Sequence, residues 1–284
     1  MPWRELTGKR VLITGASQGI GYALAVAAAK KGCKVVASAR TAGLLGTLTA
    51  EVQASGGTIV PVTADVADPD GRAAMLAAAV QHFGGLDVLV NNAGVGATGH
   101  FMEVQPETLR QIFEVNVFAA AELIRLCLPE LRKGDQPLIV NVSSVLGKRA
   151  FPGRSFYSAS KFALHGLSDA IRAELSRDNI GVLVVSPGLT KTNFSQNMIE
   201  RVSRMSMDHA RGMTPEQVAD ATIRAMEKGK SDITLTTGGR LLVIVNRICP
   251  WVIERIAARR VRKTFAAERS ARFAPASSGV GSHA

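Results

Sequence analysis

Short apolar runs alternate along the chain with longer segments in which apolar residues recur at helical spacing. The runs are unbroken, which is typical of strands buried on both faces of a parallel sheet. They lie at residues 10–14, 34–38, 58–62, 87–91, 137–142, 181–186 and 232–236. The intervening segments predict helices at residues 19–31, 41–54, 69–83, 106–132 and 154–177. This order predicts an α/β fold, a doubly wound parallel sheet with crossover helices on both faces.

Residues 187–240 interrupt this rhythm. The stretch 193–211 is rich in Met and polar residues and predicts further helix. Another helix is expected to start at Thr214, whose hydroxyl can cap it, with Pro215 in its first turn. Since no internal linker or repeat is visible, we expect one domain over residues 1–239.

A glycine-rich segment, Thr14-Gly-Ala-Ser-Gln-Gly-Ile-Gly21, joins the first predicted strand to the first predicted helix. Gly15 permits a tight turn, Gly19 lets the backbone approach a pyrophosphate, and Gly21 lets the helix pack closely on the sheet. The free N–H groups and the positive dipole end at the helix start favour phosphate groups. A turn that binds nothing is the alternative, but the strand–helix context favours a dinucleotide site.

The spacing Thr-Gly-x-x-x-Gly-x-Gly resembles the short-chain dehydrogenase/reductase superfamily, in its compact single-domain branch with a Rossmann fold. Further motifs carry the resemblance, so that it spans about residues 8–192. They are Asn91-Asn-Ala-Gly94, Asn116 within a long helix, Ser144, Tyr157 and Lys161 in the order Ser-x12-Tyr-x3-Lys, and Pro187-Gly188-x3-Thr192. A substrate lid at about residues 190–213 is implied by the same resemblance.

The resemblance implies a bound nicotinamide dinucleotide. Asp65 and Val66 would face the adenine, while Pro187, Gly188 and Thr192 would lie over the nicotinamide carboxamide. The full expected set of cofactor contacts is Gly15, Ser17, Gln18, Gly19, Ile20, Gly21, Ser38, Arg40, Thr41, Asp65, Val66, Asn92, Ala93, Gly94, Tyr157, Lys161, Pro187, Gly188 and Thr192. For Asp65 a helix-capping role is the alternative.

The end of the second strand bears on the choice between NADP(H) and NAD(H). An acidic residue there would bind the ribose 2′-hydroxyl, whereas an arginine accommodates a 2′-phosphate. The strand ends Ser38-Ala39-Arg40-Thr41 with no acid nearby, and Arg40 would offer a planar, permanently charged donor. We therefore expect NADP(H), with NAD(H) as the weaker alternative. The glycine turn departs from this picture, since it lacks the basic residue that NADP-preferring relatives often carry there.

Tyr157 and Lys161 are four residues apart in a predicted helix, so their side chains share one face. A free tyrosine titrates near 10, and a nearby ammonium favours the phenolate. The resemblance implies that Tyr157 exchanges the proton, that Lys161 also binds the nicotinamide ribose and that Ser144 holds the substrate oxygen. It further implies that Asn116 binds a water that links Lys161 to solvent; a helix-bend residue is the alternative. Ser143 is also hydroxylic, but the spacing to Tyr157 favours Ser144.

These features predict an NADP(H)-dependent oxidoreductase that transfers hydride between the nicotinamide and a carbonyl or alcohol. Met and Phe side chains between residues 193 and 213 favour an apolar or lipid-like substrate. One alternative is a cofactor-binding scaffold or redox-sensing regulator without turnover, against which the intact Ser144, Tyr157 and Lys161 argue. Another is a nucleotide-sugar epimerase or dehydratase, which the compact glycine spacing disfavours.

The formal charge of +11 is concentrated near the C-terminus. Residues 240–284 carry nine Arg and Lys against two Glu, so the high pI does not describe a basic groove across the fold. We expect a basic amphipathic helical extension at 240–273 and a disordered tail at 274–284. The extension either docks on the fold or on a partner subunit, or else contacts a membrane surface through residues 240–263. No nucleic acid is expected as a partner, since aromatic residues are sparse there.

The three cysteines lie far apart and lack the spacing of metal ligands, which fits a reducing compartment. His100 and His165 have no partners at ligand spacing, so no metal site is predicted. The first ten residues hold no apolar signal region, and we expect a cytoplasmic protein with peripheral membrane association as an option. The family resemblance implies a homodimer or homotetramer.

Overall fold

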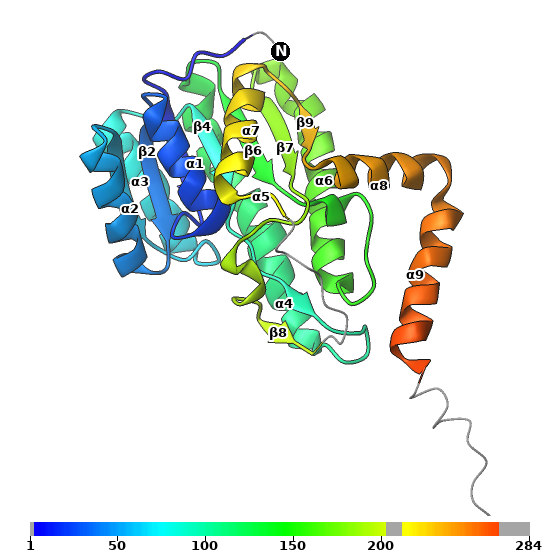
Figure 1. Cartoon of the computed structure of the whole chain (residues 1–284). Coiled ribbons are helices and arrows are strands. Elements are labelled where there is room, and N and C mark those ends of the chain that lie inside the picture. The colour runs from blue at the N-terminus through cyan, green and yellow to red at the C-terminus, as the bar shows by residue number, and fades with distance from the viewer. Residues whose placement is uncertain (1–2, 203–211, 267–284) are drawn as a thin grey trace, which may run out of the picture.

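The computed structural model describes residues 3–202 and 212–266. Its main sheet holds seven parallel strands in the order β3-β2-β1-β4-β6-β7-β9 (Figure 1). The strands are β1 (Arg10–Thr14), β2 (Lys34–Ala39), β3 (Thr58–Thr63), β4 (Val88–Asn91), β6 (Leu138–Val142), β7 (Gly181–Ser186) and β9 (Asp232–Thr234). The doubly wound α/β fold expected from the sequence is confirmed.

Helices cover both faces of this sheet. They are α1 (Gly19–Lys30), α2 (Ala42–Ala54), α3 (Pro69–Phe83), α4 (Pro106–Phe113), α5 (Ala119–Lys133), α6 (Ser155–Glu174) and α7 (Pro215–Glu227). Because alternate strand residues face opposite sides, Val11 and Val35 pack with α1, α2 and α7, whereas Leu12 and Val36 pack with α3 and α5. The strand order reverses between β1 and β4, and in such sheets ligands bind beyond the carboxyl ends of the strands at this point.

The helix expected over residues 106–132 is interrupted. Between α4 and α5 lies η1 (Glu114–Phe118), a π-helical turn that contains Asn116. Such bulges are rare and frequently occur at functional sites. The insertion was not predictable from the apolar spacing, which runs on through it.

The helix expected over residues 193–211 is wrong for its described part. Residues 193–202 form a short 3₁₀ turn, η4 (Asn193–Ser195), followed by the strand β8 (Glu200–Arg201). β8 pairs in parallel with β5 (Ala97–Thr98), which follows β4. This tertiary pairing overrides the local helical preference. Residues 203–211, the rest of the expected helix and lid, lie outside the described part of the chain.

Two further helices follow the sheet, α8 (Thr237–Ile248) and α9 (Pro250–Thr264), so the expected domain boundary at residue 239 falls inside α8. Figure 1 shows α8 leading away from the end of β9 and α9 turning sharply from it. α9 contacts the loop before α6: the Arg260 guanidinium lies 5.5 Å from the Phe151 ring centre. Within residues 3–202 and 212–266, no helix is both long and apolar enough to cross a membrane.

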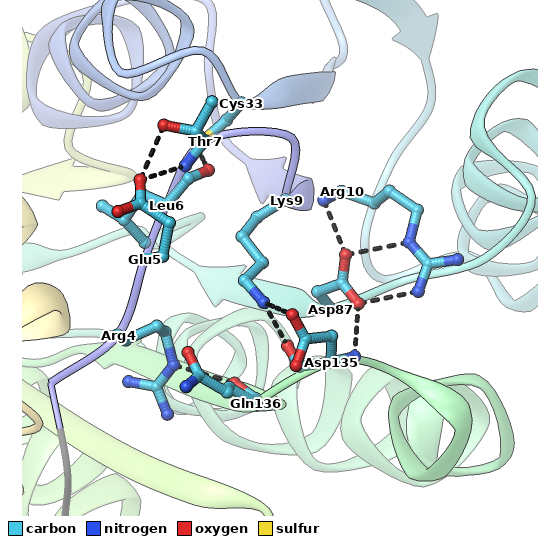
Figure 2. A network of polar contacts seen from close by, with 10 residues as sticks. All are labelled: Arg4, Glu5, Leu6, Thr7, Lys9, Arg10, Cys33, Asp87, Asp135 and Gln136. Atoms are coloured by element: carbon cyan, nitrogen blue, oxygen red, sulfur yellow. Dashed lines mark hydrogen bonds and ion pairs between the residues drawn. The ribbon is translucent and has the colours of Figure 1, made fainter.

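A polar network fixes the amino-terminal edge of the sheet, away from the carboxyl ends (Figure 2). Arg10 forms a two-point ion pair with Asp87, with N–O distances of 2.8 and 2.7 Å. Lys9 pairs with Asp135, whose backbone amide donates to Asp87 over 2.8 Å. Arg4 donates to the backbone oxygen of Gln136 over 2.8 Å. Since these bonds tie the first strand to the loop before β6, their role is to stabilise the fold.

Candidate active site

A cavity of about 960 Å³ opens at the carboxyl ends of the strands. Its walls come from the turns after β1, β2, β3, β4, β6 and β7, from the start of α6 and from the first turns of α8. The volume is at the upper end for a small-molecule site. This cavity therefore lies at the strand-order reversal, where the fold predicts a ligand.

The glycine turn at the start of α1 leaves no room for side chains. Gly15 has a φ of +65°, and a Cβ on it would lie 2.8 Å from the Cα of Ala93. Gly19 has a φ of +59°, and its Cβ would lie 3.2 Å from the Thr192 Cγ2. A Cβ on Gly21 would lie 2.3 Å from the Asn92 Nδ2. Any larger residue would thus either strain the backbone or displace the facing loops.

Thr14 and Asn92 hold this turn against the end of β4. The Thr14 hydroxyl accepts from the backbone amides of Asn92 and Ala93 over 3.1 and 3.0 Å. The Asn92 Nδ2 donates to the carbonyl oxygens of Thr14 and Gly15 over 2.9 and 3.1 Å. The Asn-Asn-Ala-Gly motif therefore orders the glycine turn as well as lining the cavity.

The start of α1 suits an anionic phosphate group. Gln18, the residue before the helix, has no side-chain cap, and the first turn carries no acid. The first amides of the helix and its positive dipole end are therefore available to a ligand. Together with the space that Gly15 and Gly19 keep open, these groups fit the pyrophosphate of a dinucleotide.

The residues after β2 and β3 face each other across the cavity mouth. Arg40 Nη1 lies 3.7 Å from Asp65 Oδ2, with 67% and 40% of the two side chains exposed. The other Asp65 oxygen accepts from the Ala67 amide over 3.0 Å. Thr41 precedes α2 and also lines the cavity. Ser38 is fully buried and does not line it, so a direct contact from its hydroxyl, expected from the sequence, is not supported.

Tyr157 and Lys161 lie one turn apart on α6 and both line the cavity. The Lys161 Nζ is 5.8 Å from the centre of the Tyr157 ring and donates to the Val142 carbonyl over 3.0 Å. The structure therefore brings the phenol and the ammonium together in the cavity that the glycine turn also lines, at the end of β6.

Burial shifts the pKa values of both Tyr157 and Lys161. It raises the pKa of Tyr157 to about 12, while a hydrogen bond with Ser144 and the charge of Arg154 lower it in part. Burial lowers the pKa of Lys161 to about 8. The sequence led us to expect Lys161 to lower the pKa of Tyr157; instead Ser144 and Arg154 do so. Burial outweighs both, because removing the phenolate from water disfavours its charge.

Ser144 and Ser143 have different surroundings. The Ser144 hydroxyl accepts from the Leu146 amide over 3.1 Å, in the 3₁₀ turn η2 (Val145–Gly147), and contacts Tyr157. The Ser143 hydroxyl donates to the backbone oxygen of Lys161 over 3.4 Å. The geometry thus places Ser144, rather than Ser143, beside the phenol.

Asn116 lies behind the cavity wall and is 1% exposed. Its Nδ2 donates to the Val95 carbonyl and to the Ser160 hydroxyl, each over 2.9 Å, and its Oδ1 accepts from the Val95 amide. A Cβ on Gly94 would lie 3.2 Å from the Asn116 Oδ1 and 3.5 Å from the Lys161 Nζ. Asn116 and Lys161 therefore both approach Gly94, although the hydrogen bonds of the Asn116 amide are to the Val95 backbone and to Ser160.

Most of the other expected residues do line the cavity. They are Ser17, Ile20, Val66, Ala93, Pro187, Gly188 and Thr192, together with Gly15, Gln18, Gly19, Asn92 and Gly94. Gly21 lies beneath the turn, where it allows the close packing described above.

Several lining residues were not identified from the sequence, among them Phe151, Arg154 and Leu242. Arg154 stands three residues before Tyr157, a spacing that puts both on one side of a helix start, and this signal was available. Leu242 belongs to α8, in the segment that the sequence analysis assigned to a C-terminal extension and gave no role in the site. His165 is buried and its ring nitrogen lies 3.1 Å from the Ser186 hydroxyl, which makes it a packing residue.

Comparisons with known proteins agree with this geometry. A family model described as short chain dehydrogenase matches residues 9–203. Dehydrogenase/reductase SDR family member 7B of Mus musculus is 36% identical over 262 residues, covering 89% of this chain and 81% of the relative.

Two solved structures are also similar. A short-chain dehydrogenase/reductase from Burkholderia phymatum in complex with NAD is 25% identical with a TM-score of 0.80, covering 88% of this chain and 96% of that one. A 3-ketoacyl-(acyl-carrier-protein) reductase from Brucella melitensis complexed with NADH is 30% identical with a TM-score of 0.72, covering 81% and 95%.

Proposed function

This chain belongs to the short-chain dehydrogenase/reductase family, and we propose that it is an NADP(H)-dependent reductase or dehydrogenase acting on a carbonyl or alcohol. The observation that carries the proposal is the position of Tyr157 and Lys161 in the same cavity as the glycine turn. A phenol, an ammonium and a dinucleotide cradle are the groups that this reaction needs in one place.

The residues of the chain have distinct roles in this proposal. Gly15, Gly19 and the first amides of α1 hold the pyrophosphate, and the nicotinamide, when bound, supplies or accepts the hydride. In the reducing direction, Ser144 donates a hydrogen bond to the carbonyl oxygen. As the carbonyl carbon gains the hydride, Tyr157 transfers its proton to that oxygen, and in the oxidising direction its phenolate takes the proton back.

Lys161 supports the phenolate that Tyr157 becomes. The ammonium is already held by the Val142 carbonyl, so little reorganisation is needed when the phenol loses its proton. Lys161 and the nearby Asn116 then form the route by which the proton is replaced from solvent.

Arg40 is the feature that favours NADP(H) over NAD(H). Two solved relatives hold NAD and NADH. In this chain the end of β2 offers a largely exposed guanidinium and no acid, and its 3.7 Å contact with Asp65 is a weak surface pair. A 2′-phosphate would therefore gain a strong bidentate partner at little expense.

The walls next to Tyr157 favour a substrate with an apolar part. The Phe194 ring centre is 5.6 Å from that of Tyr157, and Phe151 and Met198 complete the wall. Turnover of NADPH and of NADH across steroid, fatty-acyl, sugar and small aliphatic carbonyls would test the proposal. We expect at least one class to be reduced, with NADPH preferred.

The outer face of α8 supports a proposal about location. Leu241, Ile244 and Ile248 recur at helical spacing and are 60%, 54% and 72% exposed, and Trp251 at the start of α9 is 54% exposed. Seven Arg and Lys against one acid surround them between residues 237 and 264. We propose that this face rests on an anionic lipid surface, where apolar and cationic groups both find partners.

A further inference from the structure

Arg154 is a buried cation in the wall of the active-site cavity. The residue is 8% exposed and lines the cavity together with Phe151, Tyr157 and Met198. Its amide donates to the Phe151 carbonyl over 3.1 Å, and its carbonyl accepts from the Ser158 amide over 2.8 Å. The backbone of Arg154 is therefore fixed directly before α6, one turn from the proton donor.

The guanidinium has no anionic partner in residues 3–202 and 212–266. Its Nη1 donates to the Met198 sulfur over 3.3 Å, and a thioether is a weak acceptor. Glu200, in β8, accepts instead from the Gln105 amide and the Thr108 hydroxyl, over 3.1 and 2.7 Å. The Glu200 carboxylate, two residues after Met198, is therefore bound at the start of α4 rather than by Arg154.

A second cation adds to the positive charge here. Burial lowers the pKa of Arg154, the phenol of Tyr157 raises it, and the charge of Arg201 lowers it again. An arginine remains protonated even so, because its reference pKa is above 12. A buried charge without a counter-ion is unfavourable to folding, and an anionic group of a ligand would supply the missing partner.

We propose that Arg154 binds a carboxylate or phosphate group of the substrate, so that the enzyme acts on carbonyl compounds carrying an oxyanion a short distance from the reacting carbon. This inference rests on the function proposed above. A guanidinium matches both oxyanions in a planar, bidentate geometry. Residues three apart at a helix start are neighbours, so the oxyanion lies close to the oxygen that Tyr157 protonates. The carbon chain between them lies against Phe151 and Phe194.

A different role for Arg154 makes a distinct prediction. If its charge acted only on the pKa of Tyr157, removing it would change the turnover of every substrate by the same factor. If it binds an oxyanion, removal affects only the substrates that carry one. The ratio of kcat/KM for an anionic substrate to that for its neutral analogue separates the two roles, because any common effect on Tyr157 cancels.

The test compares levulinate with its methyl ester, and hydroxyacetone phosphate with hydroxyacetone, as NADPH-dependent substrates. The two pairs distinguish a carboxylate from a phosphate. In the wild type we expect the anionic member of at least one pair to be preferred. Arg154→Met should lower that ratio by about ten- to a hundredfold, and Arg154→Lys by less. Arg149→Met, which removes an arginine from the same loop outside the cavity lining, should leave the ratio unchanged.

Binding supplies a readout that does not depend on turnover. Calorimetric titration of levulinate and of hydroxyacetone phosphate into the Tyr157→Phe protein with NADP⁺ should show binding that Arg154→Met removes. Three results would each overturn the inference. The wild type could show no preference for the anionic substrates, or Arg154→Met could lower kcat/KM equally for both members of each pair. Binding of both anions could also survive the substitution Arg154→Met. If no carbonyl is reduced but Arg154-dependent binding persists, the proposed reaction fails while the anion site stands.

Discussion

The Lys161 Nζ lies 5.8 Å from the centre of the Tyr157 ring, and both side chains line the same cavity as the glycine turn. This arrangement places two oppositely perturbed groups side by side: burial raises the pKa of the phenol to about 12 and lowers that of the ammonium to about 8. In the folded protein the charged form of each group is therefore less favourable than it is in water. Paired perturbations of this kind are typical of acid–base sites.

Replacing Lys161 by Met should stabilise the fold. The fall in pKa from 10.5 to about 8 means that keeping the ammonium charged costs about 3 kcal/mol at neutral pH. Loss of the charged hydrogen bond to Val142 offsets about 2 kcal/mol of this gain, leaving about 1 kcal/mol. Urea unfolding of the two proteins at pH 7 measures the difference, with the exposed Lys230→Met as the matched control.

The difference in unfolding free energy between the wild type and Lys161→Met should depend on pH. Lys161 loses its proton near pH 8 in the folded wild type but only near pH 10.5 in the unfolded chain. The free energy of unfolding of the wild type therefore rises between these two pH values. The advantage of Lys161→Met should therefore be largest below pH 8 and shrink towards pH 10. A variant that is less stable than the wild type at pH 7 would contradict this.

Arg40→Asp should reverse the cofactor preference. Loss of the guanidinium is expected to weaken NADPH binding by about ten- to a hundredfold, because the 2′-phosphate loses a charge-assisted bidentate partner and meets a carboxylate. NADH binding should change little. Lys34→Asp makes the same charge change at the other end of β2 and controls for net charge. Fluorescence titration measures both affinities, and an equal effect of the two substitutions would exclude the role given to Arg40.

Asp87→Asn tests the network at the amino-terminal edge of the sheet. Asp87 is 3% exposed, and burial would raise its pKa, but bonds from the Arg10 side chain and from the Arg10 and Asp135 amides lower it overall. The variant should lose roughly 3 kcal/mol of unfolding free energy at pH 7. Asp169→Asn, whose side chain is 66% exposed in its pair with Arg172, should lose less than about 1 kcal/mol.

The sign of the pH effect at Asp87 follows from its lowered pKa. The carboxylate contributes its stability above the unfolded pKa near 4, and the contribution is lost as the pH falls through the folded value. The gap between wild type and Asp87→Asn should thus narrow in acid. A gap that is constant from pH 7 to pH 3 would show that the ionised form is not what stabilises the fold.

Ile248→Asp should weaken binding to anionic vesicles. The side chain is 72% exposed on the apolar face of α8. An aspartate there would reduce the apolar area that the helix can bury in the lipid and would repel anionic lipid. Val80→Asp, at a 40% exposed position on α3, is the matched control. Co-sedimentation with phosphatidylcholine vesicles, with and without phosphatidylserine, measures binding. The wild type should need phosphatidylserine and be released by salt, and equal behaviour of all three proteins would rule out the proposed surface.

Much of the fold and the site was predictable from local signals. Unbroken apolar runs indicated the parallel strands, and the motifs around Gly15, Asn92 and Tyr157 carried the family resemblance. The π-turn at Asn116 and the strand β8 were not predicted, because both depend on contacts with β5 and its neighbouring segments rather than on local spacing. The spacing of Arg154 to Tyr157 could have placed it near the site, but its burial without a counter-ion in the described residues is visible only in the packed structure.

The position of α8 was also beyond sequence reasoning. Its basic and apolar residues predicted an extension that docks on the fold, on a partner subunit or on a membrane, but they did not indicate that Leu242 and Gly239 would line the active-site cavity. The start of α8 returns to the sheet because Thr236 caps the helix by accepting from the Gly239 amide over 3.0 Å, directly after β9. The position of α8 is therefore set by one turn, which the spacing of apolar residues along the sequence does not reveal.

The most direct test compares the two tyrosines of the chain. Tyr157→Phe removes the proposed proton donor, whereas Tyr22→Phe removes a hydroxyl that donates to Glu51 over 2.5 Å away from the cavity. With a substrate found in the carbonyl screen, Tyr157→Phe should bind NADPH as the wild type does but lose at least about a hundredfold in kcat, and Tyr22→Phe should keep its turnover. Full turnover by Tyr157→Phe would contradict the proposed proton transfer, and NADPH binding without turnover of any carbonyl by the wild type would indicate a cofactor-binding regulator instead.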